Sequence, residues 1–234
     1  MFEAVKYFWA LRKQHYKKNV LIIGAGPSVG LADVSSIRAL QDRGWCIVTL
    51  KQASLFYSNF DIAIANDVRE TRIEKQRRDQ NLIGVSRPKL DLDWDIKVPI
   101  LAYWWSLTML RRPLMFLWNP LWNPFRPWGV GVFFEMAIFL PYIFKSRQIA
   151  TIGFDMAITD GKGFDHFYGT KHNEVFDQGV SREISLISGC TRKIKKIFKD
   201  KNCEIRSLTV EESPISFKKY TDSKKFFADL ISVS

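Results

Sequence analysis

The segment that most constrains the fold is the apolar run Val20 to Ile23, which stops at Gly24-Ala25-Gly26-Pro27-Ser28. Short runs of β-branched residues and leucine are typical of strands that are buried on both faces of a parallel sheet. Apolar residues then recur at helical spacing from Val29 to Leu40, and Gly44 follows. The order strand, glycine turn and helix predicts that the chain begins as a parallel α/β sheet, with one helix over Ser28 to Arg43.

The glycine turn predicts an anion site. Backbone N–H groups in a loop between a strand and a helix point toward one place, where the helix dipole adds partial positive charge. Glycine permits close backbone approach, and Ser28 can cap the helix or bind a phosphate oxygen. We therefore expect Gly24, Ala25, Gly26, Pro27 and Ser28 to hold the phosphate end of a nucleotide, and the alternative is a tight turn without a ligand.

The rest of the chain continues the α/β alternation. Further strands are predicted at Cys46–Leu50, Phe60–Ala65, Leu82–Ser86, Ile100–Tyr103, Gln148–Ile152 and Cys203–Leu208. Helices are predicted at residues 1–17 (amphipathic), 132–144 (buried) and 174–199. Residues 66–81 are strongly charged and indicate a solvated helix or loop, and 103–128 form a Trp-rich insertion. The prediction is a single Rossmann-like domain over 1–234, with a mostly parallel sheet flanked by helices.

The glycine spacing does not match a dinucleotide fingerprint. Val29 stands where its third glycine belongs, and the second strand runs into Lys51 rather than an acidic residue that would bind ribose hydroxyls. Lys51 would suit a 2′-phosphate, so an NADP-dependent oxidoreductase remains an alternative. A P-loop is excluded because Gly-Lys-Ser/Thr is missing.

Four motifs in order resemble those of the family 42 sialyltransferases and related enzymes that use CMP-activated sialic acid or Kdo. That family has Gly-x-Gly-Pro-Ser after its first strand, as in Gly24 to Ser28, and an Asn after its third, as at Asn66. Its Ser-Gly before a buried helix is Val130-Gly131 here, and its Gly-Ile-Asp-Phe strand end is Gly153-Phe154-Asp155. The resemblance touches most of residues 19–210, and the chain departs from it at Val130, where the family has Ser, and at Lys51, where the family has Asn.

The resemblance implies a glycosyltransferase that moves Kdo or sialic acid from a CMP-sugar to a lipid-linked or surface-polysaccharide acceptor. It implies that the nucleotide also contacts Lys51, Asn66, Gly131 and Asp155. The loop at 161–169 is more similar to the wider group of bacterial surface-polysaccharide enzymes with this fold.

The resemblance places a general base in the loop after Asp155, where the chain has His166 and His172. Either histidine can take this role, and His172 is favoured because it adjoins the long helix. By the same analogy, Tyr168 would donate to the leaving phosphate.

No metal or cofactor is expected, because CMP leaves as a single phosphate ester. The triad Asp91-x-Asp93-x-Asp95 has the form of a metal–diphosphate motif, but its charged surroundings favour a solvated loop.

Charge indicates where such an enzyme would work. The net charge is +11, and Arg111, Arg112 and Arg126 alternate with tryptophans in the insertion, a mixture that suits an anionic membrane surface or a Trp-rich core. We predict no signal peptide and no bilayer-spanning segment, and the three cysteines form no disulfide framework. The expected location is cytoplasmic, peripheral at the inner face of the cell membrane, without nucleic acid and with a homo-oligomer left open. A non-catalytic membrane- or nucleic-acid-binding module is the remaining alternative.

Overall fold

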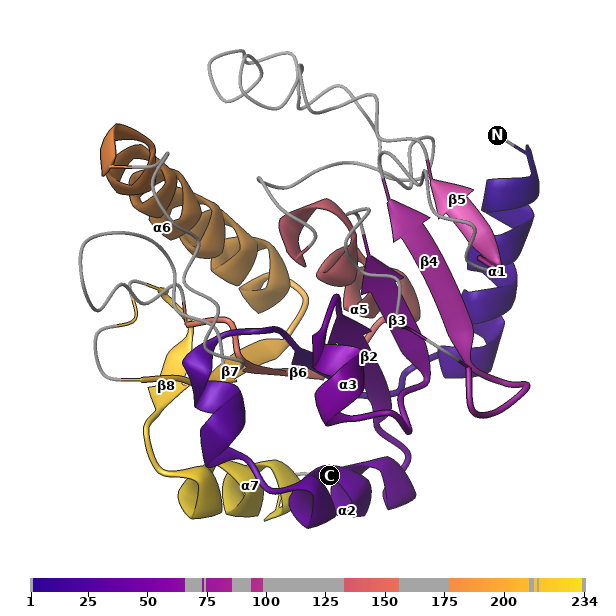
Figure 1. Ribbon diagram of the computed structural model, residues 1–234, viewed down its shortest axis with the longest axis horizontal. Helices are drawn as coiled ribbons and strands as arrows, with labels where there is room; N and C mark the ends of the chain where they lie inside the picture. The colour runs from indigo at the N-terminus through magenta and orange to yellow at the C-terminus, as the bar shows by residue number, and fades with distance from the viewer. Residues whose placement is uncertain are drawn as a thin grey trace.

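An eight-stranded sheet forms the centre of the computed structural model (Figure 1). The structure describes residues 2–65, 73, 75–85, 94–98, 133–155, 177–210, 213 and 215–232. The strands lie in the order β5-β4-β3-β2-β1-β6-β7-β8, and every neighbouring pair is parallel. The strands are β1 (Val20–Ile23), β2 (Cys46–Leu50), β3 (Ile62–Ala65), β4 (Asn81–Val85), β5 (Ile96–Val98), β6 (Gln148–Ile152), β7 (Glu204–Leu208) and β8 (Lys218–Tyr220).

Helices cover both faces of this sheet. The helices are α1 (Phe2–His15), the 3₁₀ helix η1 (Pro27–Leu31), α2 (Val34–Asp42), α3 (Ala53–Phe56), the π-helix η3 (Phe133–Ala137), α5 (Phe139–Phe144), α6 (Asp177–Lys199) and α7 (Ser223–Ser232). Figure 1 shows α1, α5 and α6 on one side of the sheet and α2 and α7 on the other.

Alternation along the strands builds a core on each face. Val20 and Ile22 of β1 pack with α1, α5 and α6, whereas Leu21 and Ile23 pack with α2 and α7. Successive side chains of a strand point to opposite faces, so a strand that is apolar at every position is buried twice. The burial of all residues of β1, β2, β3 and β6 follows from this three-layer arrangement.

The predicted fold class, a Rossmann-like parallel sheet flanked by helices, is confirmed. The helix predicted over Ser28 to Arg43 is wrong in one respect, because η1 ends at Leu31 and α2 begins anew at Val34. Asp33 separates the two helices, and its carboxylate accepts the N–H of Ser36 at 3.0 Å and so caps α2.

The sequence periodicity did not predict either of the two edge strands, β5 and β8. β5 lies in the charged connection that we interpreted as a loop, and β8 with α7 lies in a Lys-rich stretch to which we assigned no element. The strand predicted at Ile100–Tyr103 and the Trp-rich insertion lie outside the described residues. None of the helices in the described part of the chain is long and apolar enough to cross a bilayer.

Candidate nucleotide site at the carboxyl edge of the sheet

The strand order changes direction between β1 and β6. From β1 the chain builds outward to β5 on one side, and from β6 it builds outward to β8 on the other. Open parallel sheets bind ligands outside the carboxyl ends of the strands at such a switch point. The segments that leave the strands at this edge are Gly24–Ser28 after β1, Lys51 after β2, Gly153–Asp155 after β6 and Thr209–Val210 after β7.

Two glycines allow the loop after β1 to lie directly against the end of β6. The N–H of Gly24 donates to Ile152 O at 2.7 Å, and that of Gly26 donates to Gly153 O at 2.8 Å. A Cβ at Gly24 would overlap Gly153 O, and one at Gly26 would lie 2.5 Å from Asp155 Oδ2. Both positions therefore require glycine for close packing between the two loops.

The buried carboxylate of Asp155 connects the loops at this edge by hydrogen bonds. Its Oδ2 accepts the N–H of Ser28 at 2.9 Å, and its Oδ1 accepts the N–H of Val210 at 2.9 Å. The side chain is fully buried. Burial raises the pKa of this carboxyl, although the hydrogen bonds from Ser28 and Val210 oppose that shift. One carboxylate thus joins the segments that follow β1, β6 and β7.

The hydroxyl of Ser28 also faces the protein. Its Oγ accepts the N–H of Gly153 at 2.8 Å, and the side chain is fully buried. The N–H groups of Gly24, Gly26 and Ser28 therefore all have acceptors within the chain, and Pro27 has no N–H. The role of Gly24 to Ser28 in holding a phosphate remains a prediction, but these three amides would reach a ligand only by leaving their present partners.

The N-terminus of α2 is also already capped by a negative charge, the carboxylate of Asp33. Asp33 places a carboxylate at its first turn, where both Ser35 and Ser36 donate their hydroxyls to it. These hydrogen bonds lower the pKa of Asp33 to about 2, so the cap is ionised at neutral pH. A phosphate at this helix end would meet a negative charge.

Lys51 is the described cation that directly follows β2, the strand beside β1. It adopts a left-handed backbone conformation, with φ of 56°, and its N–H donates to Ile64 O at 2.9 Å. Left-handed conformations are costly for residues other than glycine, asparagine and aspartate, and such strain gathers at functional sites. The family that this chain resembles has Asn at this position, which the same backbone conformation would suit.

The remaining predicted site residues, Asn66, Gly131, His166, Tyr168 and His172, lie outside the described residues, so their roles stay predictions. Of the Asp-x-Asp triad, only the last member is described. Asp95 forms an ion pair with Lys75 and accepts the N–H of Leu82 at 2.6 Å, which is a structural role beside β4. No cluster of potential metal ligands occurs in the part of the chain that the structure describes.

Sequence reasoning missed the segment after β7. Val210 supplies the second donor to Asp155, and the fully buried hydroxyl of Thr209 lacks a hydrogen-bond partner within the described part. The available signal was position alone, because Thr209 directly follows a strand and so reaches the same edge as Asp155.

No protein-family model matches this chain, and no curated protein matches its sequence. The resemblance to CMP-sugar transferases therefore rests on the short sequence motifs alone.

Proposed function

We propose that the chain is a glycosyltransferase that moves an acidic sugar, Kdo or sialic acid, from a CMP-sugar to a lipid-linked or surface-polysaccharide acceptor. The observation that carries the proposal is the pairing of Gly24–Ser28 with Gly153–Asp155 at the β1/β6 switch point, with Lys51 at the end of the neighbouring strand β2. These are the positions at which the resembled family binds its nucleotide.

The occupied amides favour a nucleoside monophosphate over a dinucleotide. A dinucleotide places its pyrophosphate on free loop amides at a helix N-terminus. Here Gly24, Gly26 and Ser28 donate within the protein, and Asp33 caps the helix that follows. A single phosphate ester needs fewer donors, and we assign one of them to the ammonium of Lys51, the residue that follows β2.

The proposed reaction needs one base and one donor. The acceptor hydroxyl oxygen forms a bond to the anomeric carbon, the bond from that carbon to the phosphate oxygen breaks, and CMP leaves with the electron pair. His172 or His166 takes the acceptor's proton, while Tyr168 and Lys51 stabilise the charge that develops on the phosphate. The reaction requires no metal. We propose that the enzyme works at the cytoplasmic face of the cell membrane, where a lipid-linked acceptor would be anchored.

Titration calorimetry with CMP and with NADP tests the nucleotide class. The proposal expects a heat of binding for CMP and a weaker one or none for NADP. Binding of NADP without CMP would instead support the oxidoreductase alternative and end the transferase proposal.

The His166→Ala/His172→Ala double variant tests the chemistry. It should bind CMP as the parent protein does and fail to transfer sugar from CMP-Kdo and CMP-sialic acid. Mass analysis of surface glycolipids from a deletion strain then identifies the donor by the acidic sugar that is missing. A strain with the double variant and an unchanged glycolipid would favour the non-catalytic alternative.

A further inference from the structure

Helix α1 and Tyr16, the residue that follows it, present two rings to solvent beside the buried side of the helix. Phe8, Leu11 and His15 face the core and are at most 4% exposed. Trp9 and Tyr16, on the neighbouring side, are 59% and 45% exposed. Side chains three and four positions apart share one face of a helix, so both rings and Arg12 form one row on the outside of the molecule.

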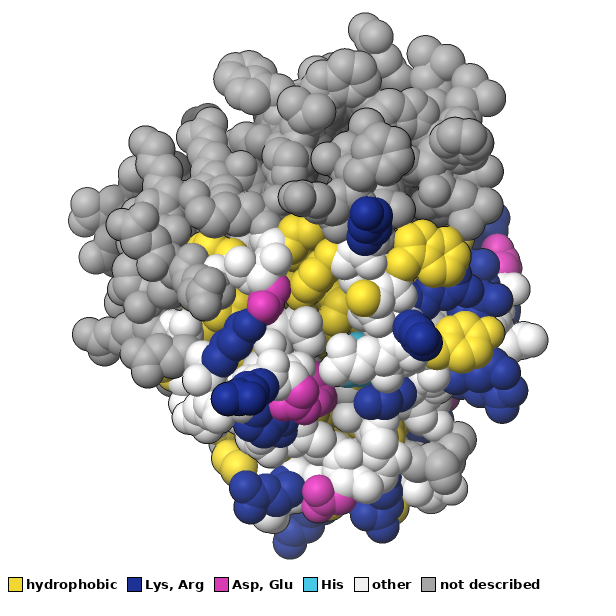
Figure 2. Space-filling model, turned by 90° about the vertical axis from the view of Figure 1, so that its right-hand side faces the viewer, with side chains coloured by type: hydrophobic (Ala, Val, Ile, Leu, Met, Phe, Trp, Pro, Cys, Tyr) yellow, Lys and Arg dark blue, Asp and Glu magenta, His cyan; other side chains and the backbone are white. Residues whose placement is uncertain are grey.

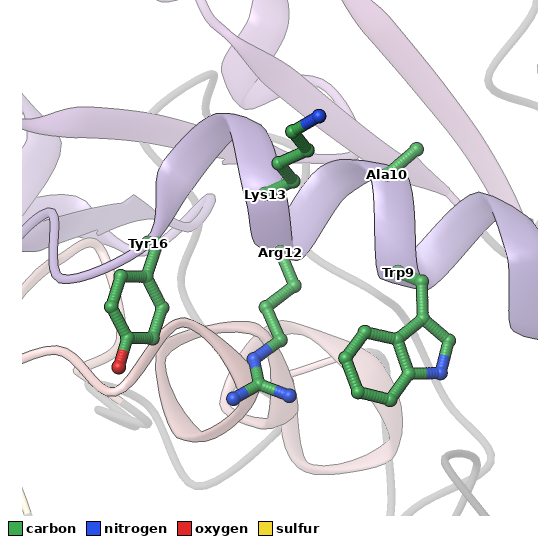
Figure 3. Close-up of a pocket in the computed structure, with 5 residues that line it drawn as sticks. All are labelled: Trp9, Ala10, Arg12, Lys13 and Tyr16. Carbon is green, nitrogen blue, oxygen red and sulfur yellow. The ribbon is translucent and has the colours of Figure 1, made fainter.

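Cations cover the faces of both rings. The guanidinium of Arg12 lies between them, 4.8 Å from the centroid of Trp9 and 5.7 Å from that of Tyr16 (Figure 3). The ammonium groups of Lys17 and Lys145 approach Tyr16 at 5.5 and 5.9 Å. Trp9, Arg12, Lys13 and Tyr16 line a depression on the surface together with Ala10 (Figure 3).

The basic side chains around the two rings form no salt bridge with any described acidic side chain. The salt bridges between described side chains involve Lys75, Arg77, Arg206 and Lys218, and none involves Arg12, Lys13, Lys17 or Lys145. Figure 2 shows hydrophobic side chains among dark-blue Lys and Arg side chains on the side of the molecule where α1 lies. We call the set Trp9, Arg12, Lys13, Tyr16, Lys17 and Lys145 the α1 surface.

We propose that the α1 surface docks on an anionic lipid bilayer. Trp and Tyr favour the membrane–water interface because each ring has an apolar body and a polar edge. Lys and Arg beside them would meet lipid phosphates, and their aliphatic stems can lie along the apolar layer while the charges stay at the headgroups. Aromatic insertion and electrostatic attraction together provide the two contributions that stable peripheral binding requires.

The position of the cations on the two rings favours a bilayer over a nucleic acid as the partner. A single-stranded nucleic acid binds by stacking bases on open ring faces. Here Arg12 occupies a face of each ring, and Lys17 and Lys145 crowd Tyr16. Both residues nevertheless stay largely exposed, and the polar edge of an indole or phenol is the part that reaches the headgroup layer.

Co-sedimentation of the full-length protein with vesicles tests this assignment. Vesicles of phosphatidylcholine with phosphatidylglycerol should bind it, and vesicles of phosphatidylcholine alone should bind it weakly, with binding to the anionic vesicles falling as salt rises. The triple variant R12Q/K13Q/K17Q should lower the partition coefficient by roughly tenfold or more, since each basic residue near the surface contributes. The double variant W9A/Y16A should lower it at every salt concentration.

The matched control removes the same number of charges from the opposite layer. Arg38, Lys224 and Lys225 are exposed on α2 and α7, so R38Q/K224Q/K225Q should keep most of the binding. Equal losses in both triple variants would mean that net charge, and not the α1 surface, attracts the membrane. Full binding by R12Q/K13Q/K17Q, or equal binding to neutral vesicles, would overturn the proposal.

A readout independent of the membrane keeps this test separate from the proposed function. Circular dichroism and CMP titration should be unchanged in both α1 variants, because the α1 surface contributes nothing to the carboxyl edge of the sheet. Vesicle binding without CMP binding would support the membrane-docking proposal and contradict the transferase proposal.

Discussion

Ser28 and Asp155 are 127 residues apart in the chain, yet the N–H of Ser28 donates to Asp155 Oδ2 at 2.9 Å. The hydroxyl of Ser28 accepts the N–H of Gly153 at 2.8 Å, so the contact runs in both directions between the two loops. This reciprocal pairing, with both side chains fully buried, fixes the loop after β1 against the end of β6. The edge that we propose to bind nucleotide is thus preorganised by polar contacts inside the protein.

Ser28→Ala should destabilise the fold by about 1–3 kcal/mol, because the buried N–H of Gly153 loses its acceptor. Thermal and urea unfolding would measure the change. Ser232→Ala is the control, since its hydroxyl donates to Asp229 O at the exposed end of α7 and its loss should cost less than about 0.5 kcal/mol. Equal losses in the two variants would contradict the inferred role of Ser28.

Asp155→Asn should cost about 2–3 kcal/mol although it preserves shape. Two N–H groups, of Ser28 and of Val210, each donate to one carboxylate oxygen, and an amide offers only one acceptor. Urea unfolding with a fitted m-value measures the effect. An Asn variant as stable as the parent would show that one of these two hydrogen bonds contributes nothing.

Gly24→Ala should destabilise by about 3 kcal/mol or prevent folding, because its Cβ would overlap the backbone of Gly153. Gly30→Ala is the matched control. A Cβ at Gly30 has no atom within 4 Å among the described residues, so this change should be neutral or slightly stabilising. Comparison of the two melting temperatures tests whether the glycines of this loop differ as the packing predicts.

We expect the fold to lose stability in acid because His15 is buried in its neutral form. The imidazole is buried against Phe144, and burial, together with nearby Lys18, lowers its pKa from 6.5 to about 4, while Asp79 opposes the shift. Since the folded pKa is the lower one, the unfolded state binds the proton first as pH falls. Stability should therefore decrease by about 3 kcal/mol between pH 6.5 and pH 4. His15→Leu should flatten this part of the stability profile, and an unchanged profile would assign the acid sensitivity to other groups.

Lys51→Ala should weaken CMP binding by about tenfold, because a charge-assisted contact to phosphate is lost. Stability should change little, since alanine tolerates the left-handed conformation no better than lysine does. Calorimetry with CMP measures the effect, with Lys224→Ala, an exposed change in α7, as the control. Equal affinities of the parent and Lys51→Ala would remove Lys51 from the proposed site.

The central strands could be predicted from sequence because their burial on both faces leaves a continuous apolar run. Val20–Ile23, Cys46–Leu50 and Gln148–Ile152 match the observed strands at both ends. The edges of the sheet could not be predicted in this way. β5 and β8 have three residues each and carry lysine, as edge strands often do, so no periodic signal distinguishes them from loops.

For the candidate site, the sequence indicated which segments to compare but not how they contact one another. The motifs led us to assign Gly24–Ser28 and Asp155 to one nucleotide site, and in the structure the two segments pack together at the carboxyl edge, while nucleotide binding stays a prediction. The sequence could not reveal that the amides of Gly24, Gly26 and Ser28 donate to Ile152 O, Gly153 O and Asp155, because that pairing depends on the adjacency of β1 and β6. A glycine loop that serves tight packing and one that serves phosphate binding have the same residues, and only the partners of their N–H groups separate the two uses.

The inner position of β1 has a consequence for synthesis of the protein. β1 pairs with β2 on one side and with β6 on the other, so Val20 lies opposite both Cys46 and Ile149. A chain that emerges from the ribosome carries β1 to β5 long before β6, and until then β1 is an open apolar edge. Fragments that end before Gln148 are therefore expected to aggregate, and nascent chains of this length should be substrates for co-translational chaperones.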